Sequence, residues 1–114
     1  MEDIKKGKLK NINVAEILKL EDQVNYQEGQ VVSKTLVQNS NISMTLFAFD
    51  KGEEISSHSS SGDAMVTVLD GVGKLTVGDD IFLASKGETL IMPADIPHAV
   101  YGEEQFKMLL TVIF

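Results

Sequence analysis

Short runs of apolar and β-branched residues recur along most of the chain, and clusters of Asn, Asp, Gly and Pro separate them. Runs of this length, bounded by turn-forming residues, are typical of β-strands. After the amino-terminal part no helical segment lies between successive runs, so the pattern predicts an all-β sandwich or closed barrel and not a parallel α/β sheet. The predicted strands are residues 30–38, 42–49, 64–69, 74–77, 81–84, 89–92, 98–101 and 106–114.

The amino-terminal segment is the place where a short helical turn is predicted. Asn13 is a helix-capping residue type, and Glu16 stands at the capping-box position ahead of Ile17 and Leu18. A helix of this length is marginal in water and must pack on another part of the chain. With 114 residues, the chain is expected to form one domain over 1–114, with an arm of residues 1–28 and a barrel of residues 29–114.

Two of the predicted strands are apolar on both faces. In the strand at 42–49, Met44, Leu46 and Ala48 alternate with Phe47 and Phe49, and the strand at 106–114 has the same character. A strand exposed to water on one face alternates more cleanly between apolar and polar residues. Either two sheet layers pack on both faces or a second subunit covers the outer face, and we expect a homodimer.

Composition and charge exclude several classes of function. The net charge is −7, and the basic cluster of Lys5, Lys6, Lys8 and Lys10 is expected to be a frayed terminus, so we expect no nucleic-acid partner. The chain has no cysteine, which excludes disulfides, thiolate nucleophiles and iron–sulfur clusters. Because no apolar run approaches the ~20 residues of a membrane span and no apolar signal core is present, we expect no membrane association and a cytoplasmic location.

His58 and His98, the two histidines of the sequence, are the candidate site residues. Each lies where a connection enters a predicted strand, which is where β scaffolds usually carry their site residues. Pro97 restricts the backbone beside His98 and limits the freedom of that imidazole.

The segments around these histidines resemble the two motifs of the cupin superfamily. Gly52, five further residues, His58 and the closing Gly71 match the first motif, and Gly87, five further residues, Pro93 and then His98 match the second. The resemblance covers about residues 52–102. It implies a cupin double-stranded β-helix, a jelly-roll barrel of the RmlC-like type.

The same resemblance implies a metal site of which half the ligands are present. Metal-binding cupins use three histidines and a glutamate, but Ser60 stands at the second histidine and Ala64 at the glutamate. His58 and His98 remain as candidate ligands for a divalent metal such as Mn, Fe, Ni or Zn. Two imidazoles rarely hold such an ion without a third protein ligand. Asp63 lies next to Ala64 and points to the other face unless a bulge turns it. Two further departures are Asp95 for the usual glycine and Gly102 for the usual asparagine.

Three functions remain open from the sequence. We favour a non-catalytic small-molecule-binding protein with a degenerate metal site, because the loss of a charge at Ala64 suits a neutral or mostly apolar ligand. The alternatives are a metal-dependent oxygenase, isomerase or decarboxylase that uses His58 and His98, and a metal-free, sugar-epimerase-like acid–base catalyst with His98 as the candidate catalytic residue. The motif positions, together with strand parity for Val66 and Val100, predict a ligand pocket lined by His58, Ser60, Ala64, Val66, Met92, His98 and Val100.

Overall fold

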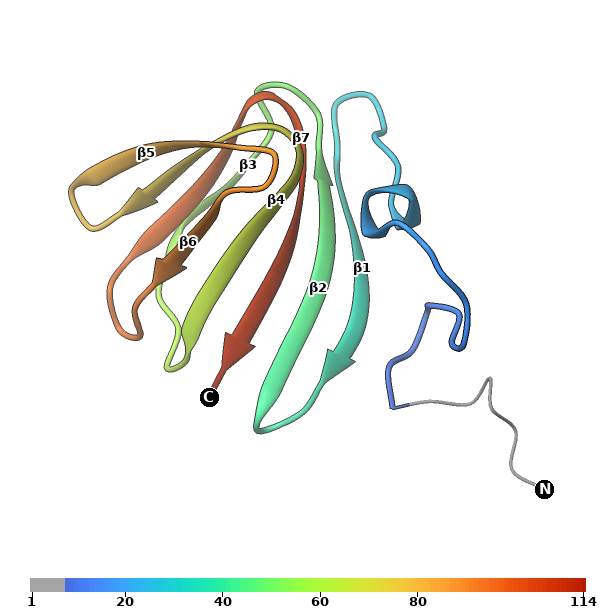
Figure 1. Cartoon of the computed structure of the whole chain (residues 1–114). Coiled ribbons are helices and arrows are strands. Elements are labelled where there is room, and N and C mark those ends of the chain that lie inside the picture. The colour runs from blue at the N-terminus through green and yellow to red at the C-terminus, as the bar shows by residue number, and fades with distance from the viewer. Residues whose placement is uncertain (1–7) are drawn as a thin grey trace.

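The computed structural model describes residues 8–114 and consists almost entirely of β-strands (Figure 1). One 3₁₀ turn, η1 (Leu20–Gln23), precedes them. Lys5 and Lys6 of the basic cluster lie outside the described residues. Within residues 8–114, no helix is both long enough and apolar enough to cross a membrane. The strands are β1 (Val31–Gln38), β2 (Ile42–Phe49), β3 (Glu54–His58), β4 (Asp63–Val77), β5 (Asp80–Ser85), β6 (Thr89–Met92) and β7 (His98–Ile113).

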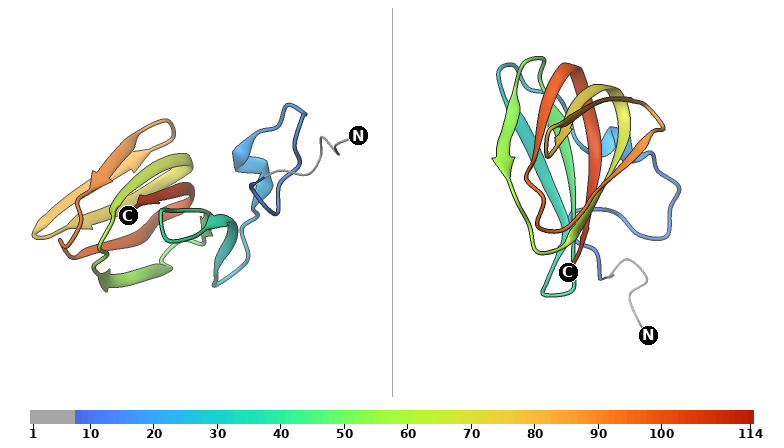
Figure 2. Two further views of the ribbon diagram at one scale, coloured as in Figure 1. Left: turned by 90° about the horizontal axis from the view of Figure 1, so that it is seen from below. Right: turned by 90° about the vertical axis from the view of Figure 1, so that its left-hand side faces the viewer.

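The long strands β4 and β7 bend and take part in both layers of a two-layered barrel (Figures 1 and 2). The first half of β7 pairs with β3 and with the second half of β4. The second half of β7 pairs with β2 and with the first half of β4. We call the layer of β1, β2, β6 and the adjoining halves of β4 and β7 the first sheet, and the layer of β3, β5 and the other halves the second sheet. This arrangement is the double-stranded β-helix that the motifs implied.

The main hydrophobic core lies between the two sheets. The rings of Phe49 and Phe106 stack at its centre with centroids 4.6 Å apart, and both side chains are fully buried. Burial of an aromatic or aliphatic side chain of this size contributes about 1.5–3 kcal/mol to folding. The other buried members of this core are Ala64, Val66, Val68, Leu75, Ala84, Met92, Val100, Met108 and Val112.

A second apolar cluster lies on the outer face of the first sheet, under the amino-terminal arm. Leu46 and Ala48 of β2 are fully buried there, and Val24 and Tyr26 of the arm pack with them. The Tyr26 hydroxyl donates a hydrogen bond of 2.6 Å to Asp70, and Lys107 Nζ donates one of 2.6 Å to the Glu21 carbonyl. Burial and the nearby Asp70 carboxylate raise the pKa of Tyr26, so the phenol keeps its donated proton at neutral pH. The chain's own arm therefore covers this half of the outer face.

The helical turn lies farther along the chain than the sequence predicted. Residues 14–16 form bends and residues 17–18 have no regular structure, and Ala15 has a φ of +60°, which no α-helix contains. The Asn13 side chain donates a hydrogen bond of 3.1 Å to the Glu16 carboxylate and does not cap a helix. The turn forms instead at Leu20–Gln23, where Leu20 packs on the outer cluster. Tertiary contact, and not the local capping pattern, decides its position.

The turn signals at residues 70–73 and around Gly102 do not end strands. Residues 64–69 and 74–77 belong to one strand, β4, and residues 98–101 and 106–114 both belong to β7, apart from Phe114. The β4–β7 pairing shifts register at Val68–Asp70 and Gly71–Gly73, so the glycines form bulges at which both strands bend. Gly71 has a φ of +72° there.

A substitution at Gly71 tests whether this bend is a steric requirement. An alanine Cβ at Gly71 would overlap the Gln105 carbonyl oxygen, whereas one at Gly29, which has a similar φ of +68°, meets no atom within 4 Å. Gly29→Ala is expected to lower the free energy of unfolding by roughly 1 kcal/mol, from backbone strain alone. Gly71→Ala is expected to lower it by more than about 3 kcal/mol or to prevent folding. Urea unfolding measures both changes, and equal losses would contradict the described close approach.

Candidate functional site

The site lies where the end of β3 meets the start of β7. His58 is the last residue of β3, His98 is the first of β7, and the strand register places them opposite each other. Their ring centroids are 4.4 Å apart with an interplanar angle of 69°. His98 is 6% exposed, while His58 is exposed to solvent. The fold thus brings the two imidazoles, forty positions apart in the sequence, into an edge-to-face contact.

Each imidazole is held through Nδ1 by a backbone carbonyl two residues earlier. His58 Nδ1–H donates to the Ser56 carbonyl at 2.9 Å, and His98 Nδ1–H donates to the Ile96 carbonyl at 3.2 Å. Because a carbonyl only accepts, these bonds fix the proton on Nδ1 in the neutral rings and leave each Nε2 as an acceptor. Pro97 fixes the short connection through which the second of these bonds forms.

The pKa of His98 lies below its usual range. Burial is the main cause, the neighbouring His58 adds to it, and the hydrogen bond to the Ile96 carbonyl opposes it. Low solvent access disfavours the charged imidazolium, and a second ring that can also carry positive charge disfavours it further. At neutral pH the buried His98 is therefore a neutral hydrogen-bond acceptor.

The loops that carry the two motifs are bonded to each other beside the histidines. The Asp95 amide donates to the Ser60 carbonyl at 2.8 Å, and the Ala94 amide donates to the Asp63 carboxylate at 2.8 Å. The Ser60 hydroxyl accepts from the Gly62 amide at 3.1 Å. Asp95 has a φ of +66°, a left-handed conformation that aspartate tolerates better than most residues, at the place where the cupin motif has glycine. Ser60 and Asp63 therefore fasten these loops together.

The other residues predicted to line a pocket lie on the inner faces of the strands. Ala64, Val66, Met92 and Val100 are all buried in the main core. Ala64 pairs with Met92 across β4 and β6. These four side chains therefore lie in the packed interior, and Ser60 is half-buried in the loop before β4.

The strand register adds wall residues that the sequence analysis did not include. One row across the second sheet runs Asp80, Val77, His98 and His58, and the next runs Phe82, Leu75, Val100 and Ile55. Opposite residues of an antiparallel pair share one face, so Val77 and Phe82 lie on the histidine side. Phe82 is 41% exposed at the edge of that face. Parity along a single strand cannot identify these neighbours, because they depend on which residues pair between strands.

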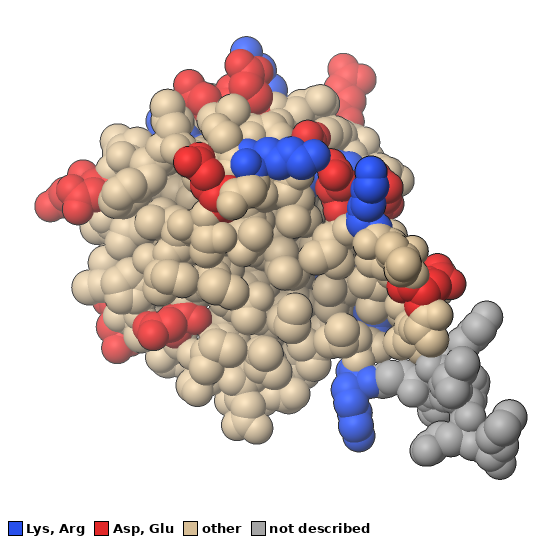
Figure 3. Space-filling view, viewed as in Figure 1, with Lys and Arg blue, Asp and Glu red and all other residues tan. Residues whose placement is uncertain are grey.

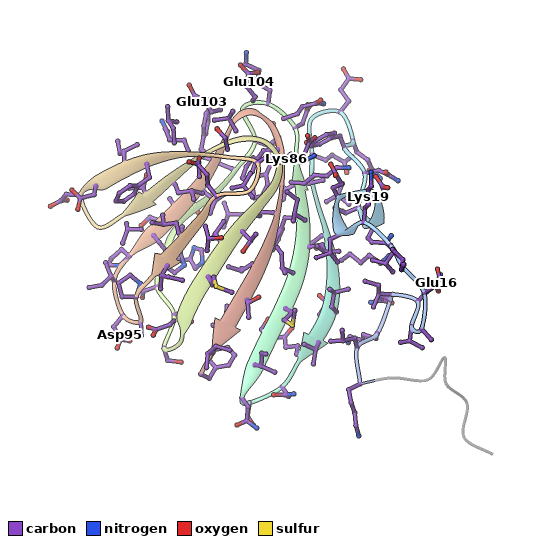
Figure 4. The ribbon with its side chains drawn as sticks, viewed as in Figure 1. Glu16, Lys19, Lys86, Asp95, Glu103 and Glu104 are labelled. Atoms are coloured by element: carbon purple, nitrogen blue, oxygen red, sulfur yellow. The ribbon has the colours of Figure 1, made fainter. Side chains whose placement is uncertain are left out.

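Two hollows on the described surface lie away from the histidine pair. A polar cleft of about 470 Å³ is lined by residues including Tyr26, Asp50 and Asp70. It lies at the Glu104 end of the barrel, whereas Asp95, which is bonded to the Ser60 loop, lies at the other end (Figure 4). An apolar groove of about 330 Å³ lies between the arm and β4. Neither hollow is lined by His58, which is exposed, or by His98, which is buried.

The donor set does not fit a tightly held divalent metal. Within residues 8–114, no group of three or more His, Cys, Asp or Glu side chains is placed to hold an ion. The Asp63 carboxylate accepts from the Ala94 amide in the loop, and Ala64 offers no donor atom. A catalytic metal site generally has three protein ligands, and the two imidazoles supply two.

Comparison with known proteins places this geometry in a family. A family model described as a cupin domain matches residues 45–114. A conserved protein of unknown function from Streptococcus pyogenes is 44% identical, with 95% of each chain covered and a TM-score of 0.92. A cupin superfamily protein from Desulfitobacterium hafniense is 30% identical over 95% of this chain and 99% of that one, with a TM-score of 0.89. A cupin 2 conserved barrel domain protein from Leptotrichia buccalis is 50% identical over 85% of this chain and 47% of that one, with a TM-score of 0.83. No curated protein matches the chain.

The lowered pKa of His98 has a consequence for stability that can be measured. The folded pKa lies below the unfolded value of about 6.5, so the free energy of unfolding is expected to fall as pH decreases through 6.5 toward the folded pKa. In His58→Ala the repulsion by the second ring is removed but the burial remains. NMR titration of the His98 ring should therefore give a pKa that rises in His58→Ala yet stays below that of a free histidine. A His98 pKa above the free value in the wild-type protein would contradict the described burial.

Proposed function

This chain belongs to the cupin family, and we propose that it binds a small organic ligand at the His58–His98 pair without a permanently held metal. The observation that supports this proposal is that both rings are tethered through Nδ1, so each Nε2 is available to a ligand. Two such acceptors beside an apolar wall suit a molecule with an apolar body and an O–H or N–H donor.

The burial of His98 supports the same class of ligand. A neutral acceptor that is buried next to Val77 is poorly solvated, and a ligand donor that reaches it replaces weak hydration by a direct hydrogen bond. A positively charged ligand group would lose its hydration beside two imidazoles. The carboxylate in the same row, Asp80, lies two strands away from His98 and so would not compensate for that loss. Neutral alcohols, phenols and amides are therefore the favoured chemistry.

A binding role is favoured over acid–base catalysis because His98 has no evident proton-transfer partner. Tyr101, three residues along β7, lies on the opposite face, where Lys74 Nζ sits 4.8 Å from its ring centroid. The Asp63 carboxylate accepts a hydrogen bond from the Ala94 amide in the loop and does not contact His98 through that bond. His58 alone contacts His98 as a second titratable ring, and an epimerase-like reaction needs an acid on the other side of the reacting carbon.

The cytoplasmic location expected from the sequence stays a prediction.

Ligand screening and metal analysis together test the proposal. Protein purified without a metal-affinity tag is expected to contain far less than one equivalent of Mn, Fe, Ni or Zn by elemental analysis. Phenol, benzyl alcohol and benzamide, each at about 10 mM, are expected to shift the ring signals of His58 and His98 and to raise the unfolding temperature of at least one sample. Ser59→Ala, a neighbouring exposed change, should keep this response, and His58→Ala should lose it.

Two results would contradict the proposal. One is a near-stoichiometric metal that His58→Ala removes, which would favour the metal-dependent enzyme. The other is a panel in which no compound moves either imidazole signal, since an accessible Nε2 pair of the described kind should respond to donors at this concentration.

A further inference from the structure

Strand β5 lies at the open edge of the second sheet. It pairs with β4 on one side, and within residues 8–114 no strand pairs with its other side (Figure 1). Its central residues are apolar and uncovered: Ile81 is 63% exposed, Phe82 is 41% exposed and Leu83 is 62% exposed. Edge strands commonly carry a charge, a proline or a bulge that prevents further pairing, and residues 81–84 carry none of these. Another strand can therefore add to the sheet at β5.

The backbone of β5 directs free hydrogen-bonding groups along this edge. In an antiparallel pair, alternate residues bond to the partner strand and the residues between them point away from it. The Ser85 amide donates to the Glu88 carboxylate at 2.7 Å, and the Ser85 carbonyl accepts from the Glu88 amide at 2.9 Å, so Ser85 points away from β4. By the same alternation Ile81 and Leu83 point their N–H and C=O groups outward, and the described part of the chain supplies no partner for them.

The opposite end of the sheet path shows how the chain covers such an edge. There the arm lies beside β1 (Figure 1). The Lys10 amide donates to the Leu36 carbonyl at 2.7 Å, and Asn11 Nδ2 donates to the Thr35 carbonyl at 2.7 Å. No segment of residues 8–114 does the same along the middle of β5. The free N–H and C=O groups alternate along an extended backbone, so the molecule that satisfies them best is itself an extended backbone.

The charge at one end of β5 favours a basic occupant. Asp79 and Asp80, at the tip of the β4–β5 hairpin, are exposed, and neither forms an ion pair within the described residues. In the space-filling view, acidic side chains stand at this left-hand margin of the molecule with no basic side chain beside them (Figure 3). At the other end of β5, Lys86 is already paired with Glu21 at 3.2 Å. Because the chain has a net charge of −7, a cationic segment is favoured over a second copy of the chain.

We propose that β5 is a docking edge for an extended basic peptide, which adds to the second sheet as a further strand. An antiparallel strand is favoured, because antiparallel pairing is slightly more stable per residue. Its carboxyl-terminal end then reaches Asp79 and Asp80, so its basic residues follow its apolar ones. Peptide residues opposite Ile81 and Leu83 extend the outer face, and the residue opposite Phe82 extends the inner one.

The length of β5 sets the length of the peptide. The strand has six residues, or about 20 Å at ~3.3 Å per residue, so a segment of about six residues covers it. Main-chain hydrogen bonds supply affinity in this mode of recognition, and the alternating side chains supply specificity. The proposal is independent of the ligand proposed for the histidine pair. It is also independent of the homodimer expected from the strands at 42–49 and 106–114, which stays a prediction.

Amide hydrogen exchange of the free protein tests the edge itself. The amides of Ile81 and Leu83 are expected to exchange nearly as fast as in an unfolded chain. Those of Phe82 and Ala84, which bond to β4, are expected to exchange at least about 100-fold more slowly. Protection of all four amides would show that the edge is already covered, by this chain or by a second copy, and would overturn the proposal.

A synthetic peptide, acetyl-Thr-Val-Thr-Val-Lys-Lys-amide, tests the occupant. Titrated to about 1 mM into ¹⁵N-labelled protein, it is expected to bind saturably, to shift the amide signals of Ile81 and Leu83 and to slow their exchange. Binding is expected to weaken at high salt, since exposed charges are screened. Two control peptides carry N-methyl groups on one or the other alternate set of residues. One set faces β5, so one control is expected to lose binding at least tenfold and the other to keep it.

Matched variants of the protein identify the edge. Leu83→Pro removes an outward donor and no bond to β4, and an edge strand tolerates proline at such a position, so binding is expected to weaken at least tenfold. Leu83→Thr keeps the N–H and is expected to bind within about threefold of the wild type. Ile81→Lys keeps the backbone and repels the basic peptide, so it too should weaken binding. Ile17→Lys adds the same charge at a fully exposed residue of the arm and should bind as the wild type does.

Three results of the peptide experiments would overturn the proposal. The first is no saturable binding up to about 1 mM. The second is equal loss, or equal retention, of binding by the two N-methylated peptides, which would mean that strand pairing is not the mode of contact. The third is wild-type affinity in folded Leu83→Pro and Ile81→Lys, which would place the peptide elsewhere on the protein. If Leu83→Pro does not fold, Ile81→Lys and the two control peptides decide.

Discussion

The antiparallel pairing of β4 with β7 is the constraint on which the rest of the structure depends. It joins residues from both ends of each strand, from Asp63 opposite Ile113 to Val77 opposite His98. Because both strands bend at glycine-containing bulges, one ladder serves two sheets, and the two inner faces close on a single core. The same bend sends the start of β7 to the edge where β3 ends, and this brings His98 against His58.

The sequence predicts the elements well where turn signals and tertiary pairing agree. The bounds of β2 and β6 match the predicted residues 42–49 and 89–92, since turn-forming residues flank both runs. The signals at residues 70–73 mislead because a β-bulge uses the same glycines as a turn, and only the partner strand distinguishes them. β3 was missed because Ser56, Ser57 and His58 are exposed and polar, and only Ile55 faces the core.

The candidate site, like the strands, could be predicted from local sequence only in part, because the rest depends on contacts between distant segments. The sequence identified His58 and His98 as the candidate site residues, because they are its two histidines and lie at strand entries, and the motif spacing around them placed the family correctly. Their mutual contact, the tethering of both Nδ1 atoms and the wall residues Val77 and Phe82 follow from strand register. Register depends on contacts between residues far apart in the sequence, and no pattern within one strand encodes it. The cover of the outer face by the arm has the same origin.

We propose that the two tethered imidazoles bind an organic ligand and not a permanently held metal. A crystal structure of protein purified without added metal, with anomalous data above and below the transition-metal edges, tests it most directly. We expect no anomalous peak between the rings, and an ordered water or organic molecule about 2.7–3.2 Å from an Nε2 atom. A single anomalous peak about 2.0–2.1 Å from both Nε2 atoms would contradict it.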